Sequence, residues 1–500
     1  MTFVGLLALA PLAAFLLVLL MPQSQSRLAA LIFSIVIFIA SGGLLVAPAE
    51  TDLLWIPSLD IHFHLGADGL SIWLVLLSTV LTPLAVLLSW KHIDHRIKAY
   101  YSLLLLLEFG LVGVFLAMDL FLFFVFWEVS LVPMYFLIGI WGHERRIYAA
   151  IKFFLYTMAG SALMLVAILY IYSRTQTFDY TTILQLMDSG VFRPTEAQQM
   201  ALFLAFFLAF AIKVPLFPFH TWLPDAHVEA PTAGSVMLAA VMLKMGTYGL
   251  VRFCLPMFPS ASRRCADWIV TLAIIGIIYG ALVALVQPNM KKLVAYSSVS
   301  HLGFVVLGIF SFTPAGLDGA VFQMLAHGIS TGALFALVGM LYERRHSLEI
   351  ADYGGVATPA PWLSTVFLIT TFASAGLPLL SNFVGEFLVL RGAAEANFKW
   401  SVYAAIGVIL SACYLLWLYQ RVFYGETSDE MKSHMPDLSA REWAALIPLL
   451  ALMLWLGSAS QTFLPRISEA TSLILKETTL NVPFRVAAPA PGTKELASAR

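Results

Sequence analysis

Six ionisable residues lie inside long apolar runs of this sequence, and their types suggest proton transfer. They are two carboxylates, two lysines and two histidines, namely Glu128, Lys213, Lys244, His301, His327 and Glu386. A charged side chain at bilayer depth costs about 2.5–3.5 kcal/mol on insertion scales. Such residues therefore need an ion or hydrogen-bond partner, contact with water, or a function that outweighs this cost. A buried lysine gives up its proton more easily, a nearby carboxylate reverses that effect, and histidine titrates near neutral pH. A line of such groups can therefore relay protons.

Each residue also has a plainer interpretation. Glu128 and Lys213 could form a salt bridge that only holds two helices together, and His301 could be a hydrogen-bonded core residue. Glu108 lies in another apolar run and could extend its flexible side chain to the membrane interface. The segment 220–227 (HTWLPDAH) contains metal-ligand residue types, but its prolines and spacing give no helical ligand register, so we expect no metal site.

Helix-breaking residues lie next to two of the six groups. They are Pro215 and Pro218 after Lys213, and Gly376 and Pro378 before Glu386. Proline removes a helical hydrogen bond and clashes with the carbonyl one turn earlier, so a seventh span at 201–222 should unwind near its middle and a twelfth span should break as well. Non-helical backbone at membrane depth persists only where it is buried in protein or lines water. Both breaks therefore indicate polar cavities.

Equal spacing suggests an internal repeat. Glu128 and Lys213 are 85 residues apart, and so are His301 and Glu386. Broken helices in corresponding halves are typical of transporters built from two repeats. We therefore expect two five-helix repeats, 101–260 (spans four to eight) and 261–425 (spans nine to thirteen), which are inverted because five is odd. The ranges 1–100 and 426–500 would hold spans one to three, and span fourteen with a polar C-terminal tail.

The composition predicts a polytopic membrane protein. Of the 500 residues, 60% are hydrophobic and 11% are charged, and the mean hydropathy is +0.88. Soluble domains carry about 25% charged residues. The formal net charge of -1 provides no basic surface for nucleic acid. The cysteines Cys254, Cys265 and Cys413 are isolated and predict neither a disulfide framework nor a thiolate metal site.

Fourteen apolar runs are long enough to cross a membrane, which takes about 20 residues of helix. They are approximately 3–20, 28–46, 69–89, 101–117, 119–140, 149–172, 201–222, 232–255, 267–286, 293–311, 318–341, 362–390, 402–424 and 442–464. The continuous run 101–140 is split at Asp119, which would be poorly placed within a span. One set of alternate loops holds 14 basic residues and the other holds 7. The richer set should be cytoplasmic, which places both termini on the non-cytoplasmic side.

Two longer motifs carry a family resemblance. The stretches 217–253 (FPFHTWLPDAHVEAPTAGSVMLAAVMLKMGTYGLVRF) and 287–304 (QPNMKKLVAYSSVSHLGF) resemble the antiporter-like membrane subunits of proton-pumping NADH–quinone oxidoreductase, complex I. The likeness covers nearly the whole chain. It is greatest to the chain M subgroup, the counterpart of mitochondrial chain 4. Glu386 stands where chains L and N have lysine, and the sequence ends soon after span fourteen.

The resemblance implies a half-channel in each repeat, joined by a polar axis along the middle of the membrane. From the controlling pair of the first half-channel, through the central links, to the terminal group of the second, the matching positions are Glu128, Lys213, Lys244, His301, His327 and Glu386. The resemblance also implies no cofactor in this chain, with FMN, iron–sulfur clusters and quinone in partner subunits. The expected partners are other membrane subunits of complex I, including two further antiporter-like chains, and membrane lipid in the inner, energy-transducing membrane.

The leading hypothesis is a proton-translocating subunit of respiratory NADH–quinone oxidoreductase, which is an enzyme only as part of that assembly. One alternative is a subunit of a multisubunit sodium/proton antiporter. Another is a structural scaffold whose pump has decayed. The buried Lys213 and Lys244 argue against the scaffold, because apolar residues could replace both without loss.

Overall fold

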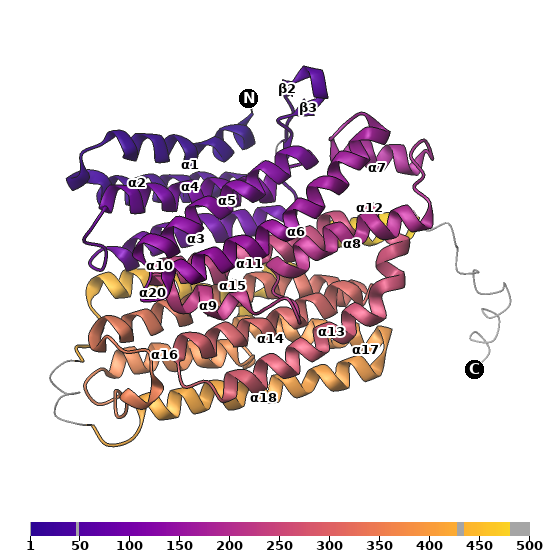
Figure 1. Cartoon of the computed structure of the whole chain (residues 1–500). Coiled ribbons are helices and arrows are strands. Elements are labelled where there is room, and N and C mark those ends of the chain that lie inside the picture. Colours follow the sequence, from indigo (N-terminus) through magenta and orange to yellow (C-terminus); the bar gives the residue numbers. More distant parts are fainter. Residues whose placement is uncertain (1, 47–49, 428–434, 481–500) are drawn as a thin grey trace.

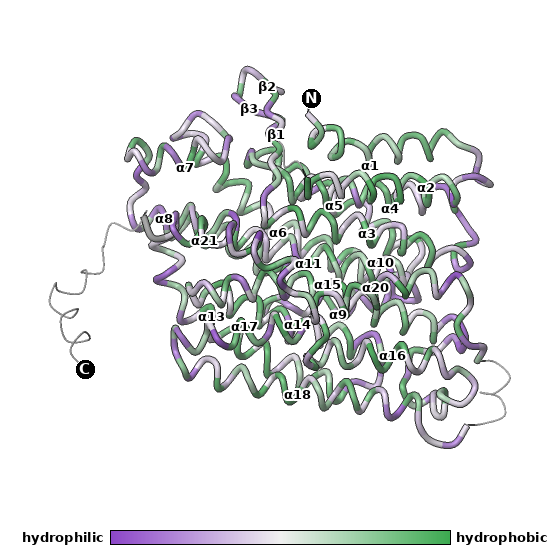
Figure 2. Tube along the Cα trace, turned by 180° about the vertical axis from the view of Figure 1, so that it is seen from behind, coloured by the Kyte–Doolittle hydropathy of each residue, from purple (hydrophilic) through white to green (hydrophobic). Residues whose placement is uncertain are grey.

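The computed structural model describes residues 2–46, 50–427 and 435–480, which form a bundle of long, roughly parallel helices (Figure 1). Hydrophobic residues occupy the lengths of the helices, and hydrophilic residues gather at the connections (Figure 2). Within the described ranges, thirteen helices are long and apolar enough to cross a membrane. The predicted all-α polytopic fold is confirmed. Lys432 and the tail beyond residue 480 lie outside the described residues.

Most predicted spans are continuous helices. The first six are α1 (Phe3–Leu20), α2 (Gln23–Ser41), α3 (Ser71–Ser89), α4 (Ile97–Leu116), α5 (Leu120–Trp141) and α6 (Arg146–Thr175). The later ones are α13 (Pro259–Leu285), α14 (Met290–Phe310), α15 (Pro314–Arg345), α18 (Phe398–Phe423) and α20 (Ala440–Ser458). Their apolar residues form one contiguous core around α14, α15 and the span Thr232–Met257, which are the most deeply buried spans.

The two predicted breaks are both present. Helix α8 (Glu196–Lys213) is a full 18 residues long, and the unwound segment 214–221 follows it before the short helix α9 (Trp222–Glu229). The break therefore lies at Pro215 and Pro218, as predicted, and separates α8 from α9. The span starts earlier than the predicted residue 201, at a capping box formed by Thr195 and Gln198. The twelfth span is broken as predicted, into α16 (Pro361–Ser374) and α17 (Ser381–Ala396).

The eighth span contains two wide turns that the sequence did not reveal. It consists of α10 (Thr232–Met237), a π-helical segment at Leu238–Met242, α11 (Leu243–Gly249), a second π-helical segment at Leu250–Cys254, and α12 (Leu255–Met257). Every residue of this span is buried. π-Helical turns are rare, and they occur frequently at functional sites.

The two halves of the bundle repeat one local arrangement. Asp119 caps α5 and forms an antiparallel bridge with Asp179; Asn289 caps α14 and forms the same bridge with Glu349. Both bridges join residues 60 positions apart. Helix α6 lies before Asp179 in the sequence, and helix α15 lies before Glu349. Each of these helices ends at a residue with left-handed backbone, Gln176 and His346 respectively. Each bridge therefore fixes the start of a helix that carries a predicted site residue.

Short elements at the end of the bundle supplement the spans. Residues 50–66 form two antiparallel pairs, β1 (Glu50–Thr51) with β4 (Leu65–Gly66) and β2 (Leu54–Ile56) with β3 (Ile61–His62). Helix α7 (Tyr180–Asp188) lies at the same end, where His64 bonds to Asp179 at 2.5 Å. The range 464–480, predicted to be part of a polar tail, is helix α21 (Leu464–Leu480). It buries Ile467 and Ile474 against the bundle because its apolar residues recur at helical spacing.

Candidate functional site

Four of the six predicted residues form one file in the centre of the bundle. Lys244 Nζ on α11 lies 2.8 Å from His327 Nδ1 on α15. The rings of His327 and His301 have centroids 5.6 Å apart. His301 Nδ1 on α14 lies 2.8 Å from Glu386 Oε1 on α17. The four side chains belong to residues that are at most 3% exposed, so the file is shielded from bulk water.

Two residues that the sequence analysis missed orient the Glu386 end of this file. Gln323 Nε2 donates to Glu386 Oε1 at 2.9 Å, and the Tyr414 hydroxyl lies 3.2 Å from His301 Nε2. Gln323 and Tyr414 are fully buried on α15 and α18. Their bonds hold the imidazole and the carboxylate in one mutual orientation. The only sequence signal was a polar residue on an otherwise apolar helix face.

The break before α17 brings unwound backbone against the same carboxylate. Gly376 has φ +78°, in the left-handed region that favours glycine. A Cβ at this position would lie 3.0 Å from Glu386 Oε2. One carboxylate oxygen of Glu386 therefore faces His301 and Gln323, and the other faces the break.

The lysine end of the file is shaped by the wide turn before it. Lys244 Nζ donates to the carbonyl of Ala239 at 2.7 Å, and Ala239 lies inside the first π-helical segment. The ammonium therefore has two neighbours, this carbonyl and His327 Nδ1. Because an ammonium has only donors, His327 Nδ1 must accept when Lys244 is charged. The state of the lysine thus sets where the imidazole carries its proton.

The remaining two predicted residues interact without a direct bond. Lys213 is 0% exposed, and within the described part of the chain its Nζ has no hydrogen-bond partner. Its Nζ lies 5.4 Å from the ring centroids of Trp127 and of Phe153, within the range of cation–π attraction. Glu128 is half-buried, and its charge acts on Lys213 through space, with no ion pair within 4.0 Å. The structure therefore does not contain a salt bridge between Glu128 and Lys213.

Further buried groups lie near the file. His227 of α9 is 0% exposed and stacks on Phe335, with ring centroids 4.4 Å apart. Lys291, which the sequence analysis counted as a loop residue, is 1% exposed and donates to the carbonyl of Ala230 at 2.8 Å. The charge of Lys291 acts on His227. The sequence placed Lys291 in a loop because the predicted span began at residue 293, whereas α14 begins at Met290.

Two other residues weighed from the sequence are Glu108 and Asp225. Glu108 is fully buried in α4, and its carboxylate oxygens have no hydrogen-bond partner among the described residues, so it does not reach the interface. Asp225 of the segment 220–227 pairs with Lys152 at 2.7 Å. Its carboxylate and the His227 ring therefore have different neighbours and do not converge on one point.

Known proteins resemble this chain in sequence and fold. The family described as "NADH:quinone oxidoreductase/Mrp antiporter, TM" matches residues 117–412. NADH-quinone oxidoreductase subunit M of Rhodobacter capsulatus is 49% identical over 413 residues, which are 81% of this chain and 80% of the relative. The chain belongs to the subunit M family. Members of the subunit M family are thus expected to share its core, and the matched range includes all six predicted residues.

Solved structures agree with this assignment. A chain of respiratory complex I from Thermus thermophilus with bound NADH superposes with a TM-score of 0.88 at 33% identity, over 95% of this chain and 99% of that one. A chain of the Mrp complex from Dietzia sp. DQ12-45-1b has a TM-score of 0.83 at 22% identity, over 96% of this chain and 55% of that one. The second likeness is one of fold. Membership of the subunit M family makes this chain part of an oxidoreductase assembly in a membrane.

Proposed function

We propose that this chain translocates protons as a membrane subunit of NADH–quinone oxidoreductase. The observation that carries the proposal is the buried file from Lys244 through His327 and His301 to Glu386, with contacts of 2.8 Å at both ends. Contacts of this length allow a proton to move between nitrogen and oxygen atoms. The redox reaction that drives the movement takes place in other subunits.

The file would work in two stages. The charge of Glu128 favours the protonated form of Lys213, and a weakening of that influence releases the proton towards Lys244. Lys244 then protonates His327 Nδ1, at 2.8 Å, and one bridging water can span the separation between His327 and His301. Glu386 receives the proton from His301 and releases it at the break beside Gly376.

The assembly and the domain limits belong to the same proposal. The ranges 101–260 and 261–425 are the two half-channels, supported by the spans in 1–100 and 426–500. FMN, iron–sulfur clusters and quinone reside in partner subunits, and two of the partners are further antiporter-like chains. The chain lies in the inner, energy-transducing membrane with both termini on the non-cytoplasmic side, as the 14 to 7 distribution of basic loop residues favours.

The test is the ratio of protons moved to electrons transferred in sealed vesicles that contain the assembled enzyme. Lys244→Ala should lower this ratio, while NADH oxidation by an artificial acceptor stays normal and confirms assembly. Lys399→Ala is the matched control because Lys399 is an exposed lysine of α18. A normal ratio in Lys244→Ala would overturn the proposal.

The sodium/proton antiporter is the second candidate, because the matching family description includes Mrp antiporters. The same vesicles distinguish the two. Sodium uptake that accompanies NADH oxidation and persists when the pH gradient is collapsed would support the antiporter. Acidification that is independent of sodium supports proton translocation alone.

A further inference from the structure

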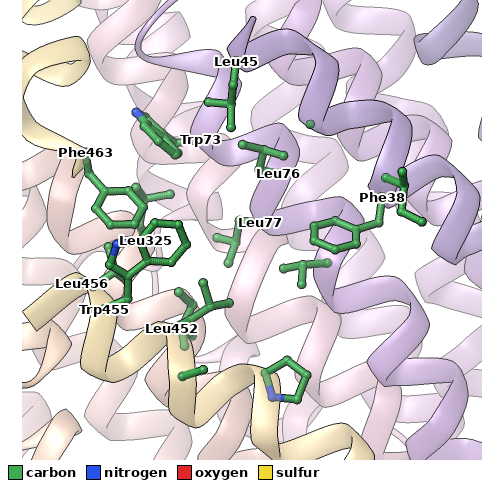
Figure 3. Close-up of a pocket in the computed structure, with 16 residues that line it drawn as sticks. Phe38, Leu45, Trp73, Leu76, Leu77, Leu325, Leu452, Trp455, Leu456 and Phe463 are labelled. Carbon is green, nitrogen blue, oxygen red and sulfur yellow. The ribbon is translucent and has the colours of Figure 1, made fainter. Parts of the chain in front are cut away.

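An apolar groove runs along the membrane face between α2, α3, α15 and α20 (Figure 3). Its volume is about 490 Å³, and all 16 residues that line it are apolar or aromatic. Leu76 and Leu77 form one wall and Leu452 the opposite one, while Phe38 lies on the α2 side (Figure 3). The two outer walls belong to helices that are largely uncovered, α2 and α20. In a membrane protein, such a groove opens onto the hydrocarbon of the bilayer.

Aromatic rings close one end of the groove. Trp73 and Trp455 both pack against Phe463, with centroid distances of 4.7 and 5.4 Å. The indole nitrogen of Trp73 lies on the ring edge that points away from Leu77 (Figure 3). This nitrogen is buried and, among the described residues, has no hydrogen-bond partner. Indoles concentrate at the level of lipid headgroups, so this end of the groove marks the membrane interface.

Arg466 stands at the same end, and it also lines a neighbouring pocket together with Arg252, Asp68, Glu469 and Glu477. Arg466 donates from Nη2 to the carbonyl of Leu45 at 2.7 Å, and Leu45 lines the groove. Within the described ranges Arg466 forms no ion pair within 4.0 Å. Its guanidinium has five donors in a fixed fork, and one bond to a carbonyl leaves the others for an anion. A phosphate is the anion that a guanidinium at a lipid interface meets.

We propose that this groove binds a membrane phospholipid, with one acyl chain between α2, α3 and α20 and its phosphate at Arg466. A volume of about 490 Å³ holds about one turn of a helix 10–12 Å in diameter, so a partner helix does not fit inside it. Its volume lies within the range of about 300–1,000 Å³ typical of small-molecule sites. The bound acyl chain fills the gap that would otherwise separate α20 from α2. This site is independent of the proton file.

The test uses the assembled enzyme in vesicles of phosphatidylethanolamine and phosphatidylglycerol. A small fraction of the phosphatidylglycerol carries a photoreactive diazirine at the middle of one acyl chain. After illumination, labelled residues are mapped by peptide mass spectrometry. We expect labelling of α2, α3 and α20 groove residues to exceed the labelling of the exposed Ile409 on α18 by about fivefold, the ratio expected for a bound chain with about 1 kcal/mol of preference.

Two matched pairs of variants make the test specific. Leu452→Trp fills the groove and should reduce its labelling to the level of Ile409, while Leu454→Trp, two residues away and 51% exposed outside the groove, should not. Arg466→Gln should reduce the labelling severalfold, and Arg174→Gln on α6 should leave it unchanged. The arginine pair decides the outcome if Leu452→Trp does not assemble. Uniform labelling of all exposed helices, or cross-links from the groove to another protein chain, would overturn the proposal.

Discussion

The two halves of the bundle hold their ionisable pairs in different ways. Both pairs are 85 residues apart in sequence, yet His301 and Glu386 touch at 2.8 Å whereas Glu128 and Lys213 interact only through space. In the second half, Gln323 and Tyr414 fix the pair. In the first half, the rings of Trp127 and Phe153 surround the lysine. A contact pair passes a proton, whereas a separated pair adjusts how strongly the lysine holds one. Under the proposed function, the first half controls and the second half conducts.

The largest expected effect comes from removing the controlling pair. Lys213→Ala and Glu128→Ala should each lower proton pumping at least about tenfold, because a positioned acid–base group contributes about 10²–10⁴-fold. Vesicle acidification is measured at equal amounts of assembled enzyme. Near-normal pumping in either variant would remove the pair from the pathway and leave the conducting file as the whole mechanism.

The conducting end is tested by changing what Glu386 can do with a proton. The Glu386→Gln side chain cannot titrate, so proton pumping by this variant should be at least about tenfold lower than that of the native enzyme. Glu386→Lys should retain more pumping, since Gln323 Oε1 has no partner within the described residues and can accept from the ammonium. Glu395→Gln, an exposed change on the same helix, serves as the control. Equal pumping by the Gln and Lys variants would show that Glu386 only packs the helix and would move the terminal role to His327.

A moderate effect is expected when the field on Lys213 is weakened. Glu128→Asp keeps the carboxylate and shortens its reach by about 1.5 Å. Pumping should fall by about twofold to threefold, because Coulomb energy declines only as the inverse of distance. The same assay applies. A loss as large as that of Glu128→Ala would mean that a specific contact, and not a field, links the pair.

A smaller effect is expected from the residue that orients His301. Tyr414→Phe removes the bond to His301 Nε2, worth about 1 kcal/mol, and should lower the pumping rate up to about fivefold. Tyr419→Phe, on the same helix as Tyr414, is the control, since the Tyr419 hydroxyl bonds instead to Ser364 of α16 at 2.7 Å. If both variants behave alike, orientation of the His301 ring does not limit conduction.

The smallest effect concerns His64, whose partner Asp179 belongs to the antiparallel bridge of the first half. Burial lowers the pKa of His64, but hydrogen bonds with Asp179 and Glu50 outweigh it and raise the pKa to about 9. Because the pKa is raised in the folded protein, protonated His64 stabilises the 50–66 segment, and this stabilisation is fully present below about pH 6.5. It is lost as the pH rises through about 9 and His64 loses its proton. Proteolytic cleavage within 52–60 should therefore accelerate between pH 6.5 and 9.5.

The matching change and its control separate this effect from general loosening. The protease should cleave the His64→Gln variant at a rate that no longer depends on pH over this interval. His95→Gln, an exposed histidine bonded to Asp94, should keep the native dependence. A pH dependence that survives in His64→Gln would assign the titration to another group.

Much of this molecule could be predicted from its sequence. Hydropathy revealed the spans, and Asp119 was expected between α4 and α5, where it caps α5 through the amide of Leu122 at 2.9 Å. Prolines and Gly376 predicted both breaks. These features are local, because they follow from the length, hydropathy and backbone limits of short segments.

The contacts of the site were beyond such reasoning. Equal spacing did not reveal that only one of the two pairs touches, because distances between helices depend on packing across the whole bundle. Gln323 lies one helical turn before His327 on α15, but nothing in the sequence alone separates it or Tyr414 from other buried polar residues. Lys291 was misplaced because α14 begins at Met290, before the predicted start of that span.

The wide turn at Leu238–Met242 makes the length of the eighth span part of its chemistry. A π-helical turn holds about one residue more than an α-helical turn, and Lys244 Nζ donates to the carbonyl of Ala239 inside it. Deleting one residue from this turn would restore ordinary α-helical winding and leave Lys244 on the same face of the span, but the turn that presents the Ala239 carbonyl to the lysine would be lost. Along this span, therefore, the number of residues sets the partners of the lysine, and a one-residue deletion should weaken the relay with every ionisable residue still present.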